Sequence, residues 1–203
     1  CDWSSDVCSS DLGKWGRYLD IDDDGIPYRT IPGTHPTRGA WVTRGSPRDE
    51  YAVYTEDGDA YRRNVDRLAK KWETAKELVP GPLFWSEPPA SAGGQFEKGY
   101  STNWPPPNGG GSDKGVIFFC TSSDSALEAL ELLAADGITL DAMRPLAFPF
   151  GKAFREFVDS HERVFVIEQN RDAQFHSLIM IELGTDPSKL IRSEEHTSEL
   201  QSH

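Results

Sequence analysis

The second half of the chain alternates between short apolar runs of strand length and longer amphipathic segments. The runs predict three buried strands, at residues 115–120, within residues 138–148 and at residues 164–168. The segments after each run repeat apolar residues at three- and four-residue spacing, which is typical of helices. Because buried apolar strands separated by helices form parallel sheets, residues 115–191 are predicted to form a layered α/β domain.

Residues that favour helix ends stand between these predicted elements. Ser122 or Ser123 is expected to cap the first helix, and Gly137 to close it. Asp172 is expected to cap the last helix. Residues 168–171 then form a polar turn between the third strand and that helix.

Residues 81–114 interrupt the pattern. Proline and glycine dominate this stretch and no apolar periodicity survives in it, so it is predicted to be a linker. Its aromatic residues (Trp85, Phe96, Tyr100 and Trp104) nevertheless indicate that parts of it pack on another surface.

Residues 13–80 predict an irregular segment followed by one long helix. The helix carries an apolar stripe of Val65, Leu68, Trp72, Ala75 and Val79, and Pro80 ends it. The part before the helix has many turns and few apolar runs, so it cannot bury much of a core alone. It is expected to dock on a partner or on another domain.

The two ends of the chain, residues 1–12 and 192–203, encode one DNA element read from opposite strands. Codons for RSEEHTSELQSH can be chosen so that the reverse complement, in another frame, reads CDWSSDVCSSDL. Such an agreement is typical of a sequencing adapter carried into a gene, so both ends are interpreted as artefacts and left out of the fold prediction. Neither is expected to pack on the core.

The remaining composition narrows the class of protein. Without the two ends, Cys120 is the one cysteine, so no disulfide-stapled fold is expected. Leaving out six acidic and one basic side chain changes the formal charge from -12 to -7, which argues against nucleic acid or an anionic membrane as partner. No apolar run approaches the about 20 residues of a membrane helix. The expected location is the cytoplasm.

Two stretches near the start invite a binding interpretation. DIDDDG, from Asp20 to Gly25, resembles the opening of a calcium loop, but its twelfth position is Ile31 where such loops need glutamate, so an acidic turn is expected. Residues 26–45 gather basic and hydroxyl side chains that suit a carboxylate or phosphate. The candidate residues are Arg29, Thr34, His35, Arg38 and Arg44, and an ion-paired interface loop is the alternative.

The remaining histidines and the cysteine do not form a recognisable site. His35, His161 and His176 lack the spacing of a metal site or a catalytic triad, so each is expected to be structural and not catalytic. Cys120 is expected at the end of a buried strand, where a reactive thiolate is disfavoured.

Residues 22–57 carry a family resemblance. DDDGIPYRTIPGTHPTRGAWVTRGSPRDEYAVYTED is similar to D-x-D-G-I-P-Y-R-T-x-P-G-T-H-P-T-[RK]-G-A, followed by T-R-G and D-E-Y-A-x-Y-T-E. This pattern belongs to the alpha subunit of 2-oxoglutarate:ferredoxin oxidoreductase, in the 2-oxoacid:acceptor oxidoreductase family. RNVDRLAKKWETAKELVP, AFPF and VFVIEQNRDAQ extend the resemblance over Asp20 to Leu190.

The resemblance implies an enzyme that oxidatively decarboxylates a 2-oxoacid to its acyl-CoA and reduces ferredoxin. Thiamine diphosphate with magnesium, an iron–sulfur cluster and coenzyme A supply that chemistry. Residues 13–80 would be the end of a pyrimidine-side domain, and residues 115–191 a domain like the C-terminal domain of transketolase. The implied partners are a beta subunit and, through the complex, ferredoxin.

The resemblance also implies that this chain alone is inactive. The family's Y-P-I-T-P motif and its thiamine-activating glutamate are absent, and most cofactor ligands lie on the beta subunit, so no catalytic residue is assigned and the chain alone is expected to bind no cofactor. The turn of Glu168, Gln169, Asn170 and Arg171 is expected to face outward and contact another subunit, because it follows a strand at the sheet edge where functional surfaces gather. The alternative for this turn is a loop that only closes the αβ unit. A non-catalytic α/β interaction or ligand-binding module remains the alternative.

Overall fold

The computed structural model of the chain describes residues 16–33, 45–86, 100–106 and 111–193. The structure divides into two compact units, Cys1–Glu77 and Leu78–His203. In the described ranges, no helix is both long and apolar enough to cross a membrane.

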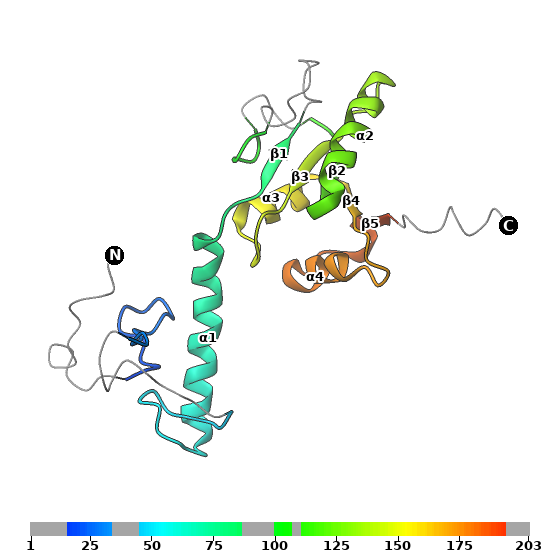
Figure 1. The fold of residues 1–203 in the computed structure, drawn as a ribbon. Helices are drawn as coiled ribbons and strands as arrows, with labels where there is room; N and C mark the ends of the chain where they lie inside the picture. Colours follow the sequence, from blue (N-terminus) through cyan, green and yellow to red (C-terminus); the bar gives the residue numbers. More distant parts are fainter. Residues whose placement is uncertain (1–15, 34–44, 87–99, 107–110, 194–203) are drawn as a thin grey trace. The chain divides into compact units, whose positions relative to one another are not determined.

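The second unit contains a five-stranded sheet in the order β1-β3-β2-β4-β5 (Figure 1). Strands β2 to β5 are parallel, while β1 is antiparallel to β3. The strands are β1 (Leu83–Trp85), β2 (Lys114–Phe118), β3 (Asp141–Arg144), β4 (Arg163–Ile167) and β5 (Leu190–Ser193). The helices are α2 (Ser123–Ala135), α3 (Lys152–Ser160) and α4 (Gln174–Leu183), with 3-10 turns η2 (Cys120–Ser122) and η3 (Pro187–Lys189). The predicted α/β class with a mostly parallel sheet is confirmed.

The two faces of the sheet bury separate sets of side chains. One core cluster joins the strands to α3 and α4 through Phe154, Phe157 and Ile179, and the other joins them to α2 through Leu127 and Leu130. Successive strand residues alternate between the clusters, as the two-residue repeat of a strand requires. Figure 1 shows α2 and α4 on opposite sides of the sheet.

Three predicted boundaries differ from the structure. The predicted linker contributes strand β1, which bonds to Ser101 through both main-chain groups of Phe84. The strand predicted at residues 115–120 ends at Phe118, and Cys120 is exposed in a turn with φ 53 instead of ending a buried strand. The predicted boundary at residue 192 falls inside β5, where Arg192 pairs with Val166. Hydrogen bonding between neighbouring strands, which local periodicity does not report, sets these limits.

Aromatic side chains hold the connection before β2 on the sheet, as predicted from their presence in the linker. The Trp104 ring lies 4.8 Å from the Phe157 ring and 5.3 Å from the Phe84 ring, centroid to centroid. Trp85 contacts Phe118 and Tyr100 in the same way. The apolar surface of these rings explains why a proline- and glycine-rich segment carries two tryptophans.

The first unit is built around helix α1 (Gly58–Leu78). The acidic turn of residues 20–25 rests directly on this helix, because a Cβ atom on Gly25 would lie 2.3 Å from the Lys71 backbone nitrogen. Two helix side chains complete the attachment: Arg67 donates to the Gly25 carbonyl at 2.8 Å, and Thr74 donates to the Asp24 carbonyl at 2.5 Å. Gly25 has φ 80, so both its conformation and its position require glycine.

Candidate functional site

The turns that follow β2 and β4 meet at the carboxyl edge of the parallel sheet. Because β2 and β4 are adjacent and parallel, both turns emerge on the same side. The Thr121 hydroxyl donates to the Gln169 side-chain oxygen at 3.3 Å, and the rings of Phe119 and Phe175 lie 4.4 Å apart. This edge is the place where sequence reasoning predicted a contact surface.

Glu168 was predicted to face outward, and this prediction is wrong. Its side chain is buried and binds the start of α4. Its carboxylate accepts hydrogen bonds from the main-chain N–H groups of Phe175, at 2.9 Å, and His176, at 3.4 Å. Glu168 therefore satisfies the donors that Asp172 was expected to cap. The structure places Ala173, not Asp172, at the N-cap, with φ 47 and no side-chain cap of its own.

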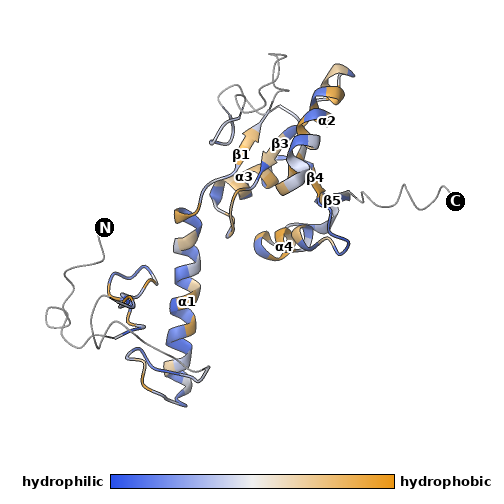
Figure 2. Cartoon of the chain, in the orientation of Figure 1, coloured by the Kyte–Doolittle hydropathy of each residue, from blue (hydrophilic) through white to orange (hydrophobic). Residues whose placement is uncertain are grey.

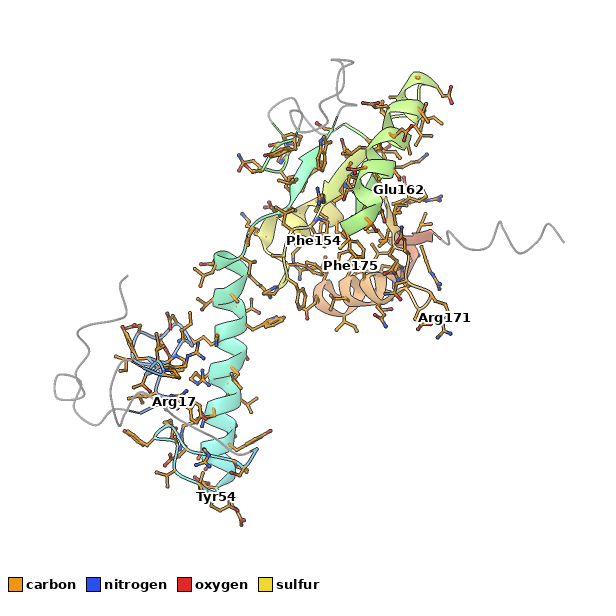
Figure 3. The ribbon with its side chains drawn as sticks, in the orientation of Figure 1. Arg17, Tyr54, Phe154, Glu162, Arg171 and Phe175 are labelled. Carbon is orange, nitrogen blue, oxygen red and sulfur yellow. The ribbon has the colours of Figure 1, made fainter. Side chains whose placement is uncertain are left out.

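The other three residues of the turn are exposed. Asn170 donates to the side chain of Gln174 and accepts from the main-chain N–H of Asp172, both at 3.2 Å. The Arg171 guanidinium contacts the Asp172 carboxylate, and Figure 3 shows Arg171 extending away from the ribbon. The Arg171 carbonyl accepts from Arg192, which fixes the turn to β5. The turn thus presents amide and guanidinium groups on a backbone held at both ends.

The candidate anion-binding loop lies mostly outside the described residues. Thr34, His35, Arg38 and Arg44 fall in residues 34–44, which the structure does not describe. Arg29 is exposed. Burial lowers the pKa of Arg17, and the positive charge of Arg29 lowers it further, so these two guanidinium groups lie close enough to repel. The structure brings one candidate arginine near a second arginine that the sequence did not single out.

The acidic turn uses its carboxylates for its own backbone. Asp20 accepts from the main-chain N–H groups of Asp24 at 3.1 Å and Gly25 at 3.0 Å, and Asp24 accepts from Ile26 at 2.7 Å. Lys70 of α1 pairs with Asp20 and Asp23. This arrangement is the acidic turn that the sequence predicted, here serving to attach residues 20–25 to α1.

A buried pair of ionisable side chains, Asp141 and His161, was not predicted as a pair. The His161 Nε2 atom lies 3.1 Å from Asp141 Oδ2, and both side chains are almost fully buried. The other ring nitrogen lies 2.6 Å from the Phe157 carbonyl, and Asp141 Oδ2 also accepts from the Ser112 N–H at 3.2 Å. The pair joins the start of β3, the end of α3 and the segment entering β2. The sequence feature that could have indicated the pair is Asp141, a charged residue at the start of an otherwise apolar strand.

The other titratable candidates are structural or isolated in the described part of the chain. His176 lies 3.3 Å from the Leu190 carbonyl through Nε2, which ties α4 to β5. Cys120 is a free, exposed cysteine. The described ranges hold no group of three or more His, Cys, Asp or Glu side chains placed to bind a metal ion.

Comparisons with known proteins identify the fold of the chain through a solved structure. No family profile matches the chain, and no curated protein matches it. A search of solved structures finds the same fold in an oxidoreductase. It is the 2-oxoglutarate:ferredoxin oxidoreductase from Magnetococcus marinus, solved with 2-oxoglutarate, coenzyme A and succinyl-CoA bound. The match has a TM-score of 0.63 at 20% identity, and covers 89% of this chain and 27% of that chain. This chain thus spans about a quarter of the length of its structural neighbour.

The described residues do not fit the metal groups that the resemblance implies. Iron–sulfur clusters are held by several cysteine thiolates, and the described residues contain Cys120 alone. Magnesium bound with a diphosphate needs carboxylate or carbonyl ligands that converge on one point. The acidic turn is the densest carboxylate group, and its Asp20 and Asp24 carboxylates already accept main-chain N–H groups.

Proposed function

We propose that this chain is part of the alpha subunit of a 2-oxoacid:ferredoxin oxidoreductase, with 2-oxoglutarate as the substrate. The shared fold over 89% of the chain is the observation that carries the proposal. The motifs between Asp20 and Leu190 support the same assignment independently, because they are read from side chains and not from the backbone. In the whole enzyme the subunit takes part in converting the 2-oxoacid to its acyl-CoA while ferredoxin is reduced.

Within that enzyme, this part of the subunit positions other parts and does not carry the reacting groups. Glu168, the most buried acidic group at the carboxyl edge, is already bonded to α4. The exposed side chains of that edge (Gln169, Asn170 and Arg171) offer hydrogen bonds suited to a polar interface. We assign them to contact with the beta subunit.

The enzymatic assignment is tested on the complete subunit that contains these residues, produced together with its beta subunit. The purified complex should reduce ferredoxin when 2-oxoglutarate and coenzyme A are both present, and should form succinyl-CoA. The 203-residue chain alone should neither bind thiamine diphosphate in calorimetry nor reduce ferredoxin. A complex that consumes none of a panel of 2-oxoacids would overturn the proposal and favour a non-catalytic α/β module.

The contact assignment is tested separately, with Asn170→Ala combined with Arg171→Ala. These side chains make exposed contacts and the Arg171 carbonyl still accepts from Arg192, so the fold should persist. Affinity for the beta subunit should fall by about tenfold or more, as loss of polar interface contacts predicts. Lys152→Ala, which removes another exposed cation of the same unit, is the control. Unchanged affinity in the double variant would refute the contact role.

A further inference from the structure

Two ionisable side chains of the second unit, Asp141 and His161, are buried together and take no part in the proposed function. The His161 side chain is 1% exposed and the Asp141 side chain is 2% exposed. Figure 2 shows hydrophobic residues along the strands β1 and β4 of the same sheet. Because apolar surroundings disfavour a net charge, the hydrogen bonds of the pair decide how many protons it holds.

The Nδ1 atom of the His161 ring has to carry a hydrogen. It lies 2.6 Å from the Phe157 carbonyl oxygen, and a carbonyl oxygen can only accept. The Ser160 hydroxyl, 3.3 Å from Nδ1, donates to the same carbonyl at 3.0 Å, so its hydrogen is directed away from the ring. A lone pair on Nδ1 would face the carbonyl oxygen at a repulsive distance. Nδ1 is therefore the donor.

A second hydrogen is required between His161 and Asp141. Nε2 lies 3.1 Å from Asp141 Oδ2, and a neutral ring that is protonated on Nδ1 has only a lone pair on Nε2. Two lone pairs would face each other unless Nε2 or Oδ2 carries a hydrogen. An imidazolium beside a carboxylate and an imidazole beside a carboxylic acid both meet this requirement, and both hold the same one proton.

The surroundings of the pair favour keeping that proton. Asp141 Oδ1 is buried and accepts no hydrogen bond within the described ranges, which is costly for a carboxylate that neither a proton nor a cation neutralises. The centroid of the His161 ring lies 4.4 Å from that of Phe157 and 5.4 Å from that of Trp104, distances at which aromatic rings stabilise a cation. Loss of the proton would leave a buried carboxylate against a ring lone pair.

The charged side chains of the elements around the pair are exposed. They belong to the segment entering β2, the end of α3 and the start of β4, and they are Asp113, Lys114, Asp159, Glu162 and Arg163. Trp104, which contacts the His161 ring, and Gly115, whose Cβ would meet that ring at 3.1 Å, carry no charge. Within the described ranges, the shared proton is what makes the pair neutral.

We propose that Asp141 and His161 form a buried proton-binding site that makes the attachment of the segment entering β2 sensitive to pH. Oδ2 also accepts from the Ser112 N–H at 3.2 Å, and the Ser112 hydroxyl donates to the Thr139 carbonyl at 3.0 Å, so the pair holds this segment. Release of the proton breaks the bond between Nε2 and Oδ2 and loosens Ser112 and Trp104 from the sheet. This inference does not depend on the oxidoreductase assignment.

The direction of the pH effect follows from the number of protons in each state. In an unfolded chain, a histidine releases its ring proton at about pH 6.5, where an aspartate is already ionised. Above about pH 6.5 the folded chain therefore holds one proton more than the unfolded chain, so raising the pH favours unfolding. The unfolding equilibrium constant rises by up to about tenfold for each pH unit until the folded pair also releases its proton.

The test compares the 203-residue chain with Asp141→Asn. The asparagine amide can donate to Nε2 of a neutral ring, so this variant keeps the contact without the shared proton. It loses the acceptor for the Ser112 N–H, which lowers stability at every pH but leaves the dependence on pH unchanged. In urea unfolding between about pH 6.5 and 8.5, the equilibrium constant should rise at least about tenfold more in the unaltered chain than in Asp141→Asn.

His176→Gln is the control for the loss of a histidine. The His176 ring faces the Leu190 carbonyl through Nε2 at 3.3 Å, a contact that a neutral ring satisfies. This variant should keep the pH dependence of the unaltered chain. NMR of the His161 ring in the unaltered chain adds a measurement that requires no variant to fold: its nitrogen signals should stay constant between about pH 6 and 8.

Two results would overturn the proposal. An equal rise of the unfolding equilibrium constant in the unaltered chain and in Asp141→Asn would show that the pair holds no extra proton in the folded chain. Nitrogen signals of His161 that change with a midpoint at about pH 6.5 would show a ring that titrates as in an unfolded chain. If Asp141→Asn fails to fold, the NMR measurement decides.

Discussion

The two units of this chain differ in how many large apolar side chains they bury. The second unit packs its strands and helices around two clusters that include Phe118, Phe154, Phe157 and Ile179. In the described part of the first unit, the buried apolar side chains are the small ones of Pro27 and Ala60, while Tyr54, Leu68 and other large apolar residues are exposed. The second unit has a core of its own, and the first is held by main-chain hydrogen bonds and ion pairs on one helix.

From this difference we expect that the first unit is completed by contacts outside itself. Apolar burial is the main favourable term in folding, and hydrogen bonds and exposed ion pairs contribute much less per contact. The exposed side chains of Tyr54, Val65 and Leu68 are the ones that such contacts would cover. A chain that spans about a quarter of its structural neighbour is consistent with such incomplete burial.

The largest difference between the units should come from truncating one large apolar residue in each. Phe157→Ala removes a fully buried ring that contacts Phe84, Trp104 and His161, and should lower the free energy of unfolding by about 4 kcal/mol. Leu68→Ala, at an exposed position of α1, should change it by about 0.5 kcal/mol or less. Urea unfolding measures both, and similar losses would show that the first unit has a core after all.

The buried polar pair should be the next most sensitive feature of the second unit. Asp141→Ala leaves His161 buried without its carboxylate and Ser112 without its acceptor, so the free energy of unfolding should fall by about 3 kcal/mol. Asp113→Ala changes the exposed residue that follows Ser112 in the sequence, and should change the free energy of unfolding by about 0.5 kcal/mol or less. Equal effects of the two variants in urea unfolding would mean that the pair does not hold the edge of the sheet.

Attachment of the first unit to α1 should depend on glycine at position 25. Gly25→Ala combines a positive φ with a Cβ atom 2.3 Å from the Lys71 nitrogen, and should destabilise the docked turn by about 2 kcal/mol. Gly33→Ala is the control for conformation alone, since φ is 92 there and a Cβ atom would meet nothing within 4 Å. Amide exchange of residues 24–26 reports the docking. If both variants exchange alike, the close approach to α1 is not what holds the turn.

The smallest expected effect concerns the start of α4. Glu168→Gln keeps one acceptor oxygen but removes the negative charge that faces the Phe175 and His176 N–H groups, and should cost about 1 kcal/mol. Gln169→Ala changes the exposed neighbour and should cost about 0.5 kcal/mol or less. Thermal unfolding distinguishes the two variants. An unchanged melting temperature for Glu168→Gln would show that another group caps α4.

Local patterns in the sequence predicted the structural features that depend on residues close together in the chain. The alternation of apolar strands with helices gave the α/β class, and the spacing of Val65, Leu68 and Trp72 located α1. Sheet neighbours far apart in sequence decided the rest: β1 and β5 are short strands whose existence depends on pairing with β3 and β4. Their few residues carry too weak a two-residue repeat to be distinguished from loops.

The sequence predicted the position of the turn after β4, but not the orientation of all four of its side chains. The turn after β4 lies at the carboxyl edge of the sheet and Asn170 and Arg171 are exposed, as expected. Glu168 turned inward because unsatisfied N–H groups at the start of α4 lie within reach of its carboxylate, which sequence spacing alone does not reveal. The Asp141–His161 pair was missed because its partners are 20 residues apart in sequence.

Native-state hydrogen exchange across the whole chain tests most directly whether the two units differ in self-sufficiency. Amides of β2 and β4 should exchange only through global unfolding, because both strands lie inside the sheet between the two cores. Amides of α1 should exchange at least about a hundredfold faster, through local opening of a unit without a core of its own. Exchange in α1 as slow as in β4 would contradict the account.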